Sequence, residues 1–211
     1  MPDNCRKFYD SHAVGFDAEQ EKFAFVRRPE KKIILETLDA ILKPEQEVLE
    51  IGAGTGRFTL LVAPRVRHVT AVDLSANMLQ QLAAKTKKQK LENIDRVHGD
   101  FMQIDFSKRF DLIIGFSAIE YIRDEGALFR KMAELLKPGG RLLLTTPHHT
   151  FIRWWGRLGN YFRQRIFMAA YSKKKMAYLL EKNQLRIVDM HALCLKTFFS
   201  PGLLLFIHAT K

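Results

Sequence analysis

A short segment near position 50 constrains the fold of this 211-residue chain more than any other. The apolar run at residues 48–51 is typical of a buried strand, and it leads into Gly52, Gly54 and Gly56. Glycine tolerates a positive φ and lets a ligand approach the backbone without meeting a Cβ. A helix beginning near Arg57 would present unpaired N–H groups to the same turn. The segment predicts a ligand-binding strand–turn–helix unit, although Arg57 stands where the dinucleotide fingerprint has its last glycine.

Further apolar segments follow at intervals that suit alternating strands and helices. The next two candidate strands end in Asp73 and in the Gly-Asp pair at Asp100, and residues 110–116 and 142–144 are two more. Nearly continuous apolar strands alternating with helices indicate a parallel sheet covered on both faces. Ligands of such sheets bind beyond the carboxyl ends of the strands, where the strand order reverses. We therefore predict a Rossmann-like, doubly wound α/β fold with helices on both faces.

These motifs together resemble those of class I S-adenosylmethionine-dependent methyltransferases, in particular the small-molecule group that includes the quinone-methylating enzymes. The resemblance runs from about Phe8 to the C-terminus, and it implies a mostly parallel sheet with an antiparallel last strand. It also implies S-adenosylmethionine as the cofactor. The residues it assigns to the cofactor are Glu50, Gly52, Ala53, Gly54 and Gly56 for the methionyl part, Asp73 and Leu74 for the ribose and adenine, Asp100 and Phe101 for the adenine, and Phe116 for the methionine and substrate side.

Residues 8–17 combine aromatic and acidic side chains, and in the resembled family such a segment folds over the cofactor as a lid. The sulfonium of the cofactor is already activated, so methyl transfer needs in-line approach, exclusion of water and at most one base. The candidates for a catalytic role are Tyr9 in the lid, Glu120 after the fourth strand, and His148 and His149 after the fifth. His148 and His149 have a plainer interpretation as solvated loop residues, and Glu120 has one as the start of the next helix.

One domain is predicted to fill residues 1–211, because 47% apolar residues suffice for a full core. Cys5 and Cys194 form neither a disulfide framework nor a metal spacing. No secretion signal or membrane span is recognised, so we expect a cytoplasmic, metal-free protein. The expected parts are an N-terminal lid and helix at 1–45, a cofactor-binding core at 46–147, a substrate-roof insertion at 148–171, and a closing helix and strands at 172–211.

Positive charge is concentrated in the last third of the chain. Residues 150–200 hold ten basic and two acidic side chains, which supplies +8 of the formal net charge of +11. Trp154, Trp155 and Phe162 share one face of a predicted amphipathic helix, and Arg153 and Arg157 lie on the other. Two interpretations stay open. The helix is only a roof over the substrate, or it also contacts an anionic membrane on its inner face.

The absence of several sequence motifs narrows the range of possible methyl acceptors. Residues 116–119 read Phe-Ser-Ala-Ile, where methyltransferases of exocyclic base amines have an Asp/Asn-Pro-Pro-aromatic motif. The later loops hold almost no carboxylates for a metal. The leading hypothesis is metal-independent methylation of a small, hydrophobic or lipid-like molecule. The alternatives are an RNA methyltransferase that uses the basic last third, ranked lower, and an inactive cofactor-binding partner protein.

Overall fold

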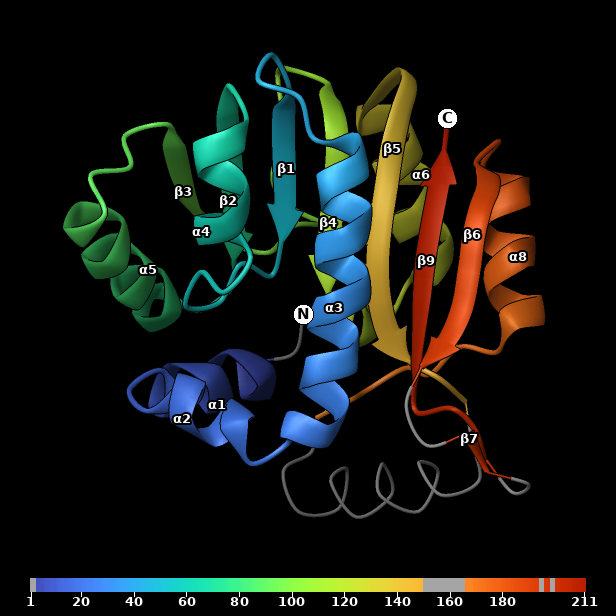
Figure 1. Ribbon diagram of the computed structural model, residues 1–211, viewed down its shortest axis with the longest axis horizontal. Coiled ribbons are helices and arrows are strands. Elements are labelled where there is room, and N and C mark those ends of the chain that lie inside the picture. Colours follow the sequence, from blue (N-terminus) through green and yellow to red (C-terminus); the bar gives the residue numbers. More distant parts are fainter. Residues whose placement is uncertain (1–2, 150–165, 194–195, 198–199) are drawn as a thin grey trace.

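A computed structural model of the protein describes residues 3–149, 166–193, 196–197 and 200–211. Its main feature is a seven-stranded sheet in the order β3-β2-β1-β4-β5-β9-β6 (Figure 1). The strands of this sheet are β1 (Glu47–Ile51), β2 (His68–Asp73), β3 (Ile94–His98), β4 (Phe110–Phe116), β5 (Leu136–Pro147), β6 (Arg186–Leu193) and β9 (Leu204–Thr210). A separate pair consists of β7 (Lys196–Thr197) and β8 (Ser200–Pro201).

Helices precede the first strand and connect the later ones. Three of them, α1 (Asp3–His12), α2 (Phe16–Glu21) and α3 (Ala24–Ile41), come before the sheet. The others are α4 (Thr59–Val62), α5 (Ala76–Lys88), α6 (Glu125–Leu135) and α8 (Lys173–Lys182), with 3₁₀ turns η1 (Ala63–Arg65) and η2 (Ile119–Tyr121). The predicted helix around Trp154 and Trp155 lies outside the described residues, as does Cys194.

The pairing of the strands confirms the predicted fold class. The pairs β1–β2, β2–β3, β1–β4 and β4–β5 are parallel. The last strand, β9, runs antiparallel between β5 and β6. Successive strands extend from β1 through β2 to β3 in one direction, and β4 and β5 lie on the other side of β1. The strand order therefore reverses between β1 and β4, which is where a ligand is expected in an open α/β sheet.

Alternate strand residues face opposite layers of helices, as the pleat of a strand requires. Val48 belongs to the apolar cluster that joins α3, α4 and α5 to the sheet. Its neighbour Leu49 belongs to the cluster on the other face, with α6 and α8. Figure 1 shows α3 in front of the sheet, while α1 and α2 lie beyond the ends toward which the parallel strands point. The predicted helices on both faces are thus confirmed.

Polar side chains begin several of the helices, as their sequences indicate. Ser75 accepts a hydrogen bond from the Met78 N–H at the start of α5, and Ser172 accepts one from the Lys175 N–H at the start of α8. Such N-caps satisfy donors that the first helical turn leaves unpaired.

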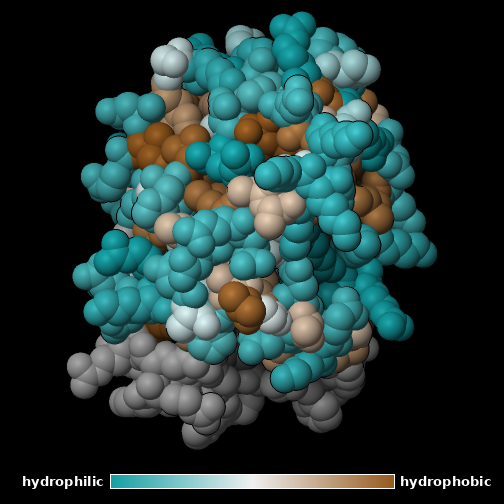
Figure 2. Space-filling view, turned by 90° about the vertical axis from the view of Figure 1, so that its left-hand side faces the viewer, coloured by the Kyte–Doolittle hydropathy of each residue, from teal (hydrophilic) through white to brown (hydrophobic). Residues whose placement is uncertain are grey.

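The outer surface is largely polar where Figure 2 views it, with hydrophobic residues in separate smaller areas. The edge strand β3 contributes exposed Asp95, Arg96 and His98. Charged side chains on an edge strand discourage pairing with another sheet. Within the described part of the chain, no helix is long and apolar enough to cross a membrane.

Candidate functional site

A cavity of about 860 Å³ opens at the carboxyl ends of β1, β2 and β4. Small-molecule sites usually measure about 300–1,000 Å³, so the cavity can hold a ligand of cofactor size with space beside it. It is lined by nine of the ten residues predicted to bind the cofactor, namely Glu50, Gly52, Ala53, Gly54, Asp73, Leu74, Asp100, Phe101 and Phe116.

The three positions after β1 require glycine for different structural reasons. All three have positive φ values, between 56° and 90°. A Cβ on Gly52 would lie 2.4 Å from the Ala118 Cβ, and one on Gly56 would lie 2.3 Å from the Leu82 Cδ1. A Cβ on Gly54 would meet no atom within 4 Å. Gly52 and Gly56 therefore allow the loop to pack, whereas Gly54 leaves open space in the cavity that a ligand can occupy.

Asp73, the last residue of β2, connects the loops that follow β1 and β2. Its Oδ2 accepts a hydrogen bond from the Gly54 N–H at 2.7 Å, and its Oδ1 accepts one from the Ser75 N–H at 2.8 Å. Burial raises the pKa of Asp73, and the two backbone hydrogen bonds oppose that shift. A carboxylate oxygen has more than one lone pair, so both oxygens can also accept hydrogen bonds from a diol.

Glu50, in β1, lies deeper than Asp73. It is only 3% exposed, and it accepts a hydrogen bond from the Thr59 hydroxyl at the start of α4. Burial raises the pKa of Glu50 to about 8, although the Thr59 hydrogen bond opposes the shift. A cationic ligand bound nearby would favour the ionised form of this carboxyl group.

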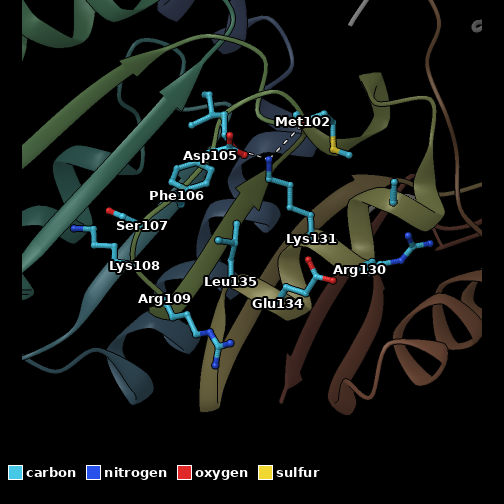
Figure 3. Close-up of a pocket in the computed structure, with 12 residues that line it drawn as sticks. Met102, Asp105, Phe106, Ser107, Lys108, Arg109, Arg130, Lys131, Glu134 and Leu135 are labelled. Atoms are coloured by element: carbon cyan, nitrogen blue, oxygen red, sulfur yellow. Dashed lines mark hydrogen bonds between the residues drawn. The ribbon is translucent and has the colours of Figure 1, made fainter.

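The loop after β3 carries Asp100 and Phe101 and is fixed from the side of α6. Lys131 donates hydrogen bonds to the carbonyls of Met102 at 3.3 Å and Ile104 at 2.6 Å (Figure 3). Its ammonium also lies 5.1 Å from the centre of the Phe101 ring. Lys131, Met102 and Ile104 line a second cavity of about 590 Å³, and none of the predicted site residues is in its lining. We interpret Lys131 as support for the loop that positions Asp100.

The N-terminal helices are attached to the loops around the larger cavity. The carboxylate of Asp10, in α1, accepts a hydrogen bond from the Ser75 hydroxyl at 2.6 Å. In α2, Asp17 accepts one from the Thr55 hydroxyl at 2.6 Å and forms an ion pair with Lys85. The aromatic side chains of α1 and α2 that line the cavity are Phe8, Tyr9 and Phe16.

The candidate catalytic residues divide between two places. Tyr9 and Glu120 line the cavity, and the Tyr9 hydroxyl donates a hydrogen bond to the Tyr121 hydroxyl at 2.7 Å. Burial raises the pKa of both tyrosines, so both stay protonated at neutral pH. His148 is buried outside the cavity lining, where its Nδ1 contacts the Gly202 carbonyl at 3.1 Å, and His149 is exposed. The structure thus brings Tyr9 and Glu120 together at the cavity but neither histidine.

The structure also contains a polar network on the cavity wall that was not predicted from the sequence. Arg27, in α3, donates hydrogen bonds to Glu30 at 2.9 Å and to the Ser117 hydroxyl at 3.0 Å. Glu30 also accepts one from the Thr145 hydroxyl of β5 at 2.6 Å. Glu30 lies four residues from Val26 and from Ile34, so a charged side chain occupies the otherwise buried face of α3. This charged position within the apolar face of α3 is the one feature of the sequence that could have indicated the network.

Comparison with known proteins identifies the family of this fold. The family model for a methyltransferase domain matches residues 48–140. Demethylmenaquinone methyltransferase of Listeria welshimeri is 34% identical over 122 residues, which are 55% of this chain and 51% of that protein. Malonyl-[acyl-carrier protein] O-methyltransferase of Priestia megaterium is 30% identical over 144 residues, 67% of this chain and 50% of that protein. The chain thus spans about half the length of these relatives.

A solved structure resembles most of the chain. The N-methyltransferase NodS of Bradyrhizobium japonicum, in complex with S-adenosyl-L-homocysteine, matches with a TM-score of 0.69 at 22% identity. The match covers 89% of this chain and 87% of that chain. Fold and site together define a class I, S-adenosylmethionine-dependent methyltransferase domain. The chain contains a methyltransferase domain of this family, as its glycine and acid motifs predicted, and the family model matches residues 48–140.

Proposed function

We propose that this protein transfers a methyl group from S-adenosylmethionine to a small, hydrophobic acceptor without a metal ion. The observation that carries the proposal is the single cavity at the reversal of the strand order. Gly54, Asp73 and Asp100 line one part of it, and the aromatic side chains of α1 and α2 line another. One cavity therefore has places for both a nucleoside cofactor and an apolar acceptor.

In this proposal the residues at the carboxyl ends of the first three strands, and in the loops that follow them, bind the cofactor. Asp73 accepts hydrogen bonds from the ribose hydroxyls, and Asp100 with Phe101 contacts the adenine. The loop from Glu50 to Gly54 holds the methionyl part, and the open space beside Gly54 allows close approach of the backbone. S-adenosylmethionine supplies an activated methyl group when bound. The protein then contributes alignment of the two reactants and exclusion of water.

The acceptor end of the cavity combines apolar and hydroxyl groups. Apolar side chains there include Val26, Met168 and Leu204, and the Tyr9–Tyr121 pair adds two hydroxyls. Such a lining favours a molecule with an apolar body. Attached to the sheet loops through Asp10 and Asp17, α1 and α2 act as the lid over the reactants.

The direct test is methyl transfer by the purified protein. Incubated with S-adenosylmethionine and lipid-soluble extracts, it should add the mass of one CH₂ unit to at least one component, detected by mass spectrometry. Asp73→Ala should weaken cofactor binding by about 1.5–3 kcal/mol, the worth of a charge-assisted hydrogen bond. The matched variant Asp95→Ala, on exposed β3, should bind normally. Tight cofactor binding without any product would support the inactive alternative, and unchanged binding by Asp73→Ala would refute the site.

We also propose that the apolar acceptor is reached at an anionic membrane surface. The sequence places paired tryptophans and many cations within 150–171, and the structure adds two exposed phenylalanines in the lid region. Phe23 and Phe25 are 53% and 58% exposed. Aromatic side chains near cations suit the interface of an anionic bilayer.

Sedimentation with anionic vesicles tests this contact. Binding should fall in Trp154→Ala/Trp155→Ala and in Phe23→Ser/Phe25→Ser, while Tyr178→Ser, an equally exposed aromatic on α8, should retain it. S-adenosylhomocysteine affinity should stay unchanged in all of them. No sedimentation of the unmodified protein at low salt would refute the membrane contact. Binding to RNA that depends on Arg153 and Arg157, but not on the aromatic residues, would favour the RNA alternative.

A further inference from the structure

The network around Glu30 lies on the acceptor side of the site. Thr145 belongs to β5, and Ser117 directly follows β4, whereas Asp73 ends β2 and Asp100 lies in the loop after β3. The strand order places β4 and β5 on the opposite side of β1 from β2 and β3. The network is therefore separated from the adenosine end of the proposed cofactor position and lies near the part of the cavity left for the acceptor.

Two guanidinium groups share one buried carboxylate in this network. Glu30 is fully buried, and its two oxygens already accept hydrogen bonds from Arg27 and Thr145. The Arg57 Nη1 lies 3.9 Å from Glu30, an ion-pair contact too long for a hydrogen bond. Further acids act on the pair, Glu120 on Arg27 and Glu21 with Asp17 on Arg57.

Both arginines have capacity for a further acceptor. Their side chains are 25% and 32% exposed, and both line the cavity. Within the described residues, no acceptor pairs with the buried Arg27 Nε. Burial and the neighbouring Arg27 lower the pKa of Arg57, although nearby acids, Glu30 first, oppose this. An anion between the two guanidinium groups would relieve the repulsion between them.

The backbone holds the network in place before any ligand arrives. Ser117 has a φ of +54°, a left-handed conformation that few non-glycine residues adopt. In this conformation its hydroxyl contacts both Arg27 and Glu30, and its N–H donates to the Thr145 carbonyl at 2.8 Å. Strained backbone of this kind is concentrated at functional sites.

We propose that Arg27 and Arg57 bind a carboxylate of the methyl acceptor, so that the acceptor is an amphiphilic acid with an apolar body. A carboxylate suits the site because it is planar, which matches the guanidinium fork, and because it carries only a single negative charge. A phosphate would bring a larger negative charge next to the buried Glu30 carboxylate. The inference rests on the proposed function, since it names the chemical class of the acceptor for the same cavity.

The test compares octanoate with its uncharged analogue octanamide, using protein saturated with S-adenosylhomocysteine. Saturation fills any site for the carboxylate of the cofactor itself. Calorimetry should show octanoate binding at least tenfold more tightly than octanamide. Arg57→Met, which removes no hydrogen bond from Glu30, should abolish that preference. Arg27→Met/Glu30→Gln removes both charges of the buried ion pair at once, so no unpaired charge is left. This double variant should also lose the preference for octanoate. Lys32→Met, an exposed cation on the same helix, should preserve it.

Three results would overturn the inference. The first is equal binding of octanoate and octanamide by the unmodified protein. The second is an unchanged preference in both arginine variants. The third is loss of S-adenosylhomocysteine affinity in those variants by the same factor, which would assign the arginines to the cofactor instead. If the unmodified protein binds no S-adenosylhomocysteine, the proposed function fails and this inference with it.

Discussion

The carboxylates at the ends of β1 and β2 differ in what surrounds them. Asp73 accepts hydrogen bonds from two backbone N–H groups of the loops, while Glu50 has the Thr59 hydroxyl and is almost completely buried. Asp73 is suited to hold the loops and the ribose. Glu50 is suited to respond to the charge of a bound cation, because a buried carboxyl group ionises only when something compensates for the lost water.

The stability of the cofactor-free protein should reflect the raised pKa of Glu50. An unfolded glutamate ionises near pH 4.5, and burial moves the folded value to about 8. Between these pH values the folded state binds more protons than the unfolded state, so the free energy of unfolding falls as pH rises. We expect the Tm of the unmodified protein to fall from pH 5 to pH 8 more steeply than that of Glu50→Gln. Each kcal/mol of lost unfolding free energy corresponds to a fall of about 2–4 °C. Identical slopes in the two proteins would contradict the buried, protonated state.

At the scale of elements, the loop after β1 connects folding to ligand binding. Its outer glycines pack against Ala118 and Leu82, and its middle glycine borders the cavity. The loop thus has one residue that can affect the ligand with little effect on packing. The helices α1 and α2 contact this loop and the next, so the proposed lid is attached to the same backbone that would hold the cofactor.

Valine substitutions in the loop should separate the two functions. Gly54→Val should retain a cooperative thermal transition, with a modest loss from its φ of +56°, but should bind no S-adenosylmethionine. Gly56→Val should lower the Tm strongly, because the new Cβ would lie 2.3 Å from Leu82. Thermal melts and calorimetry on both variants provide the comparison. Normal cofactor affinity in Gly54→Val would show that the ligand does not approach this residue.

At the scale of the whole molecule, the last strand joins the edge strand β6 to the rest of the sheet. β9 pairs with both β5 and β6, and all its residues from Leu204 to Ala209 are buried. The adjacent Lys211 extends this link, since its ammonium donates hydrogen bonds to the carbonyls of Ala133 and Leu136. Removing packing from β9 should therefore affect the entire fold.

Phe206→Ala should show this global effect. Phe206 is fully buried in the cluster that contains α3, so its truncation should reduce the free energy of unfolding by about 3–5 kcal/mol. Tyr178→Ala, at a 59% exposed position on α8, should cost less than about 0.5 kcal/mol. Urea denaturation followed by circular dichroism measures both. Equal effects in the two variants would show that β9 is not part of the cooperative core.

Much of the fold and the cofactor wall could be predicted because their signals are local. Residues 48–56 form a strand and a glycine turn through their own periodicity and backbone preferences, and Asp73 and Asp100 lie at the carboxyl ends of the next two strands. Parallel strands then bring these ends to one edge whatever the details of packing. The same reasoning put His148 and His149 at that edge, but it could not tell that His148 would turn toward the Gly202 carbonyl.

The sequence by itself determined the class of fold, the family and the residues proposed to bind the cofactor, since each depends on short local patterns that recur in order along the chain. Only the tertiary structure decided which distant side chains meet. Thr145 reaches Glu30 across 115 positions, and Tyr9 reaches Tyr121 across 112. Such contacts depend on how α1 and α3 pack over the sheet, and no local periodicity encodes that arrangement. The side of the cavity that we propose for the acceptor, with Arg27 and Arg57, could therefore be identified only from the tertiary structure.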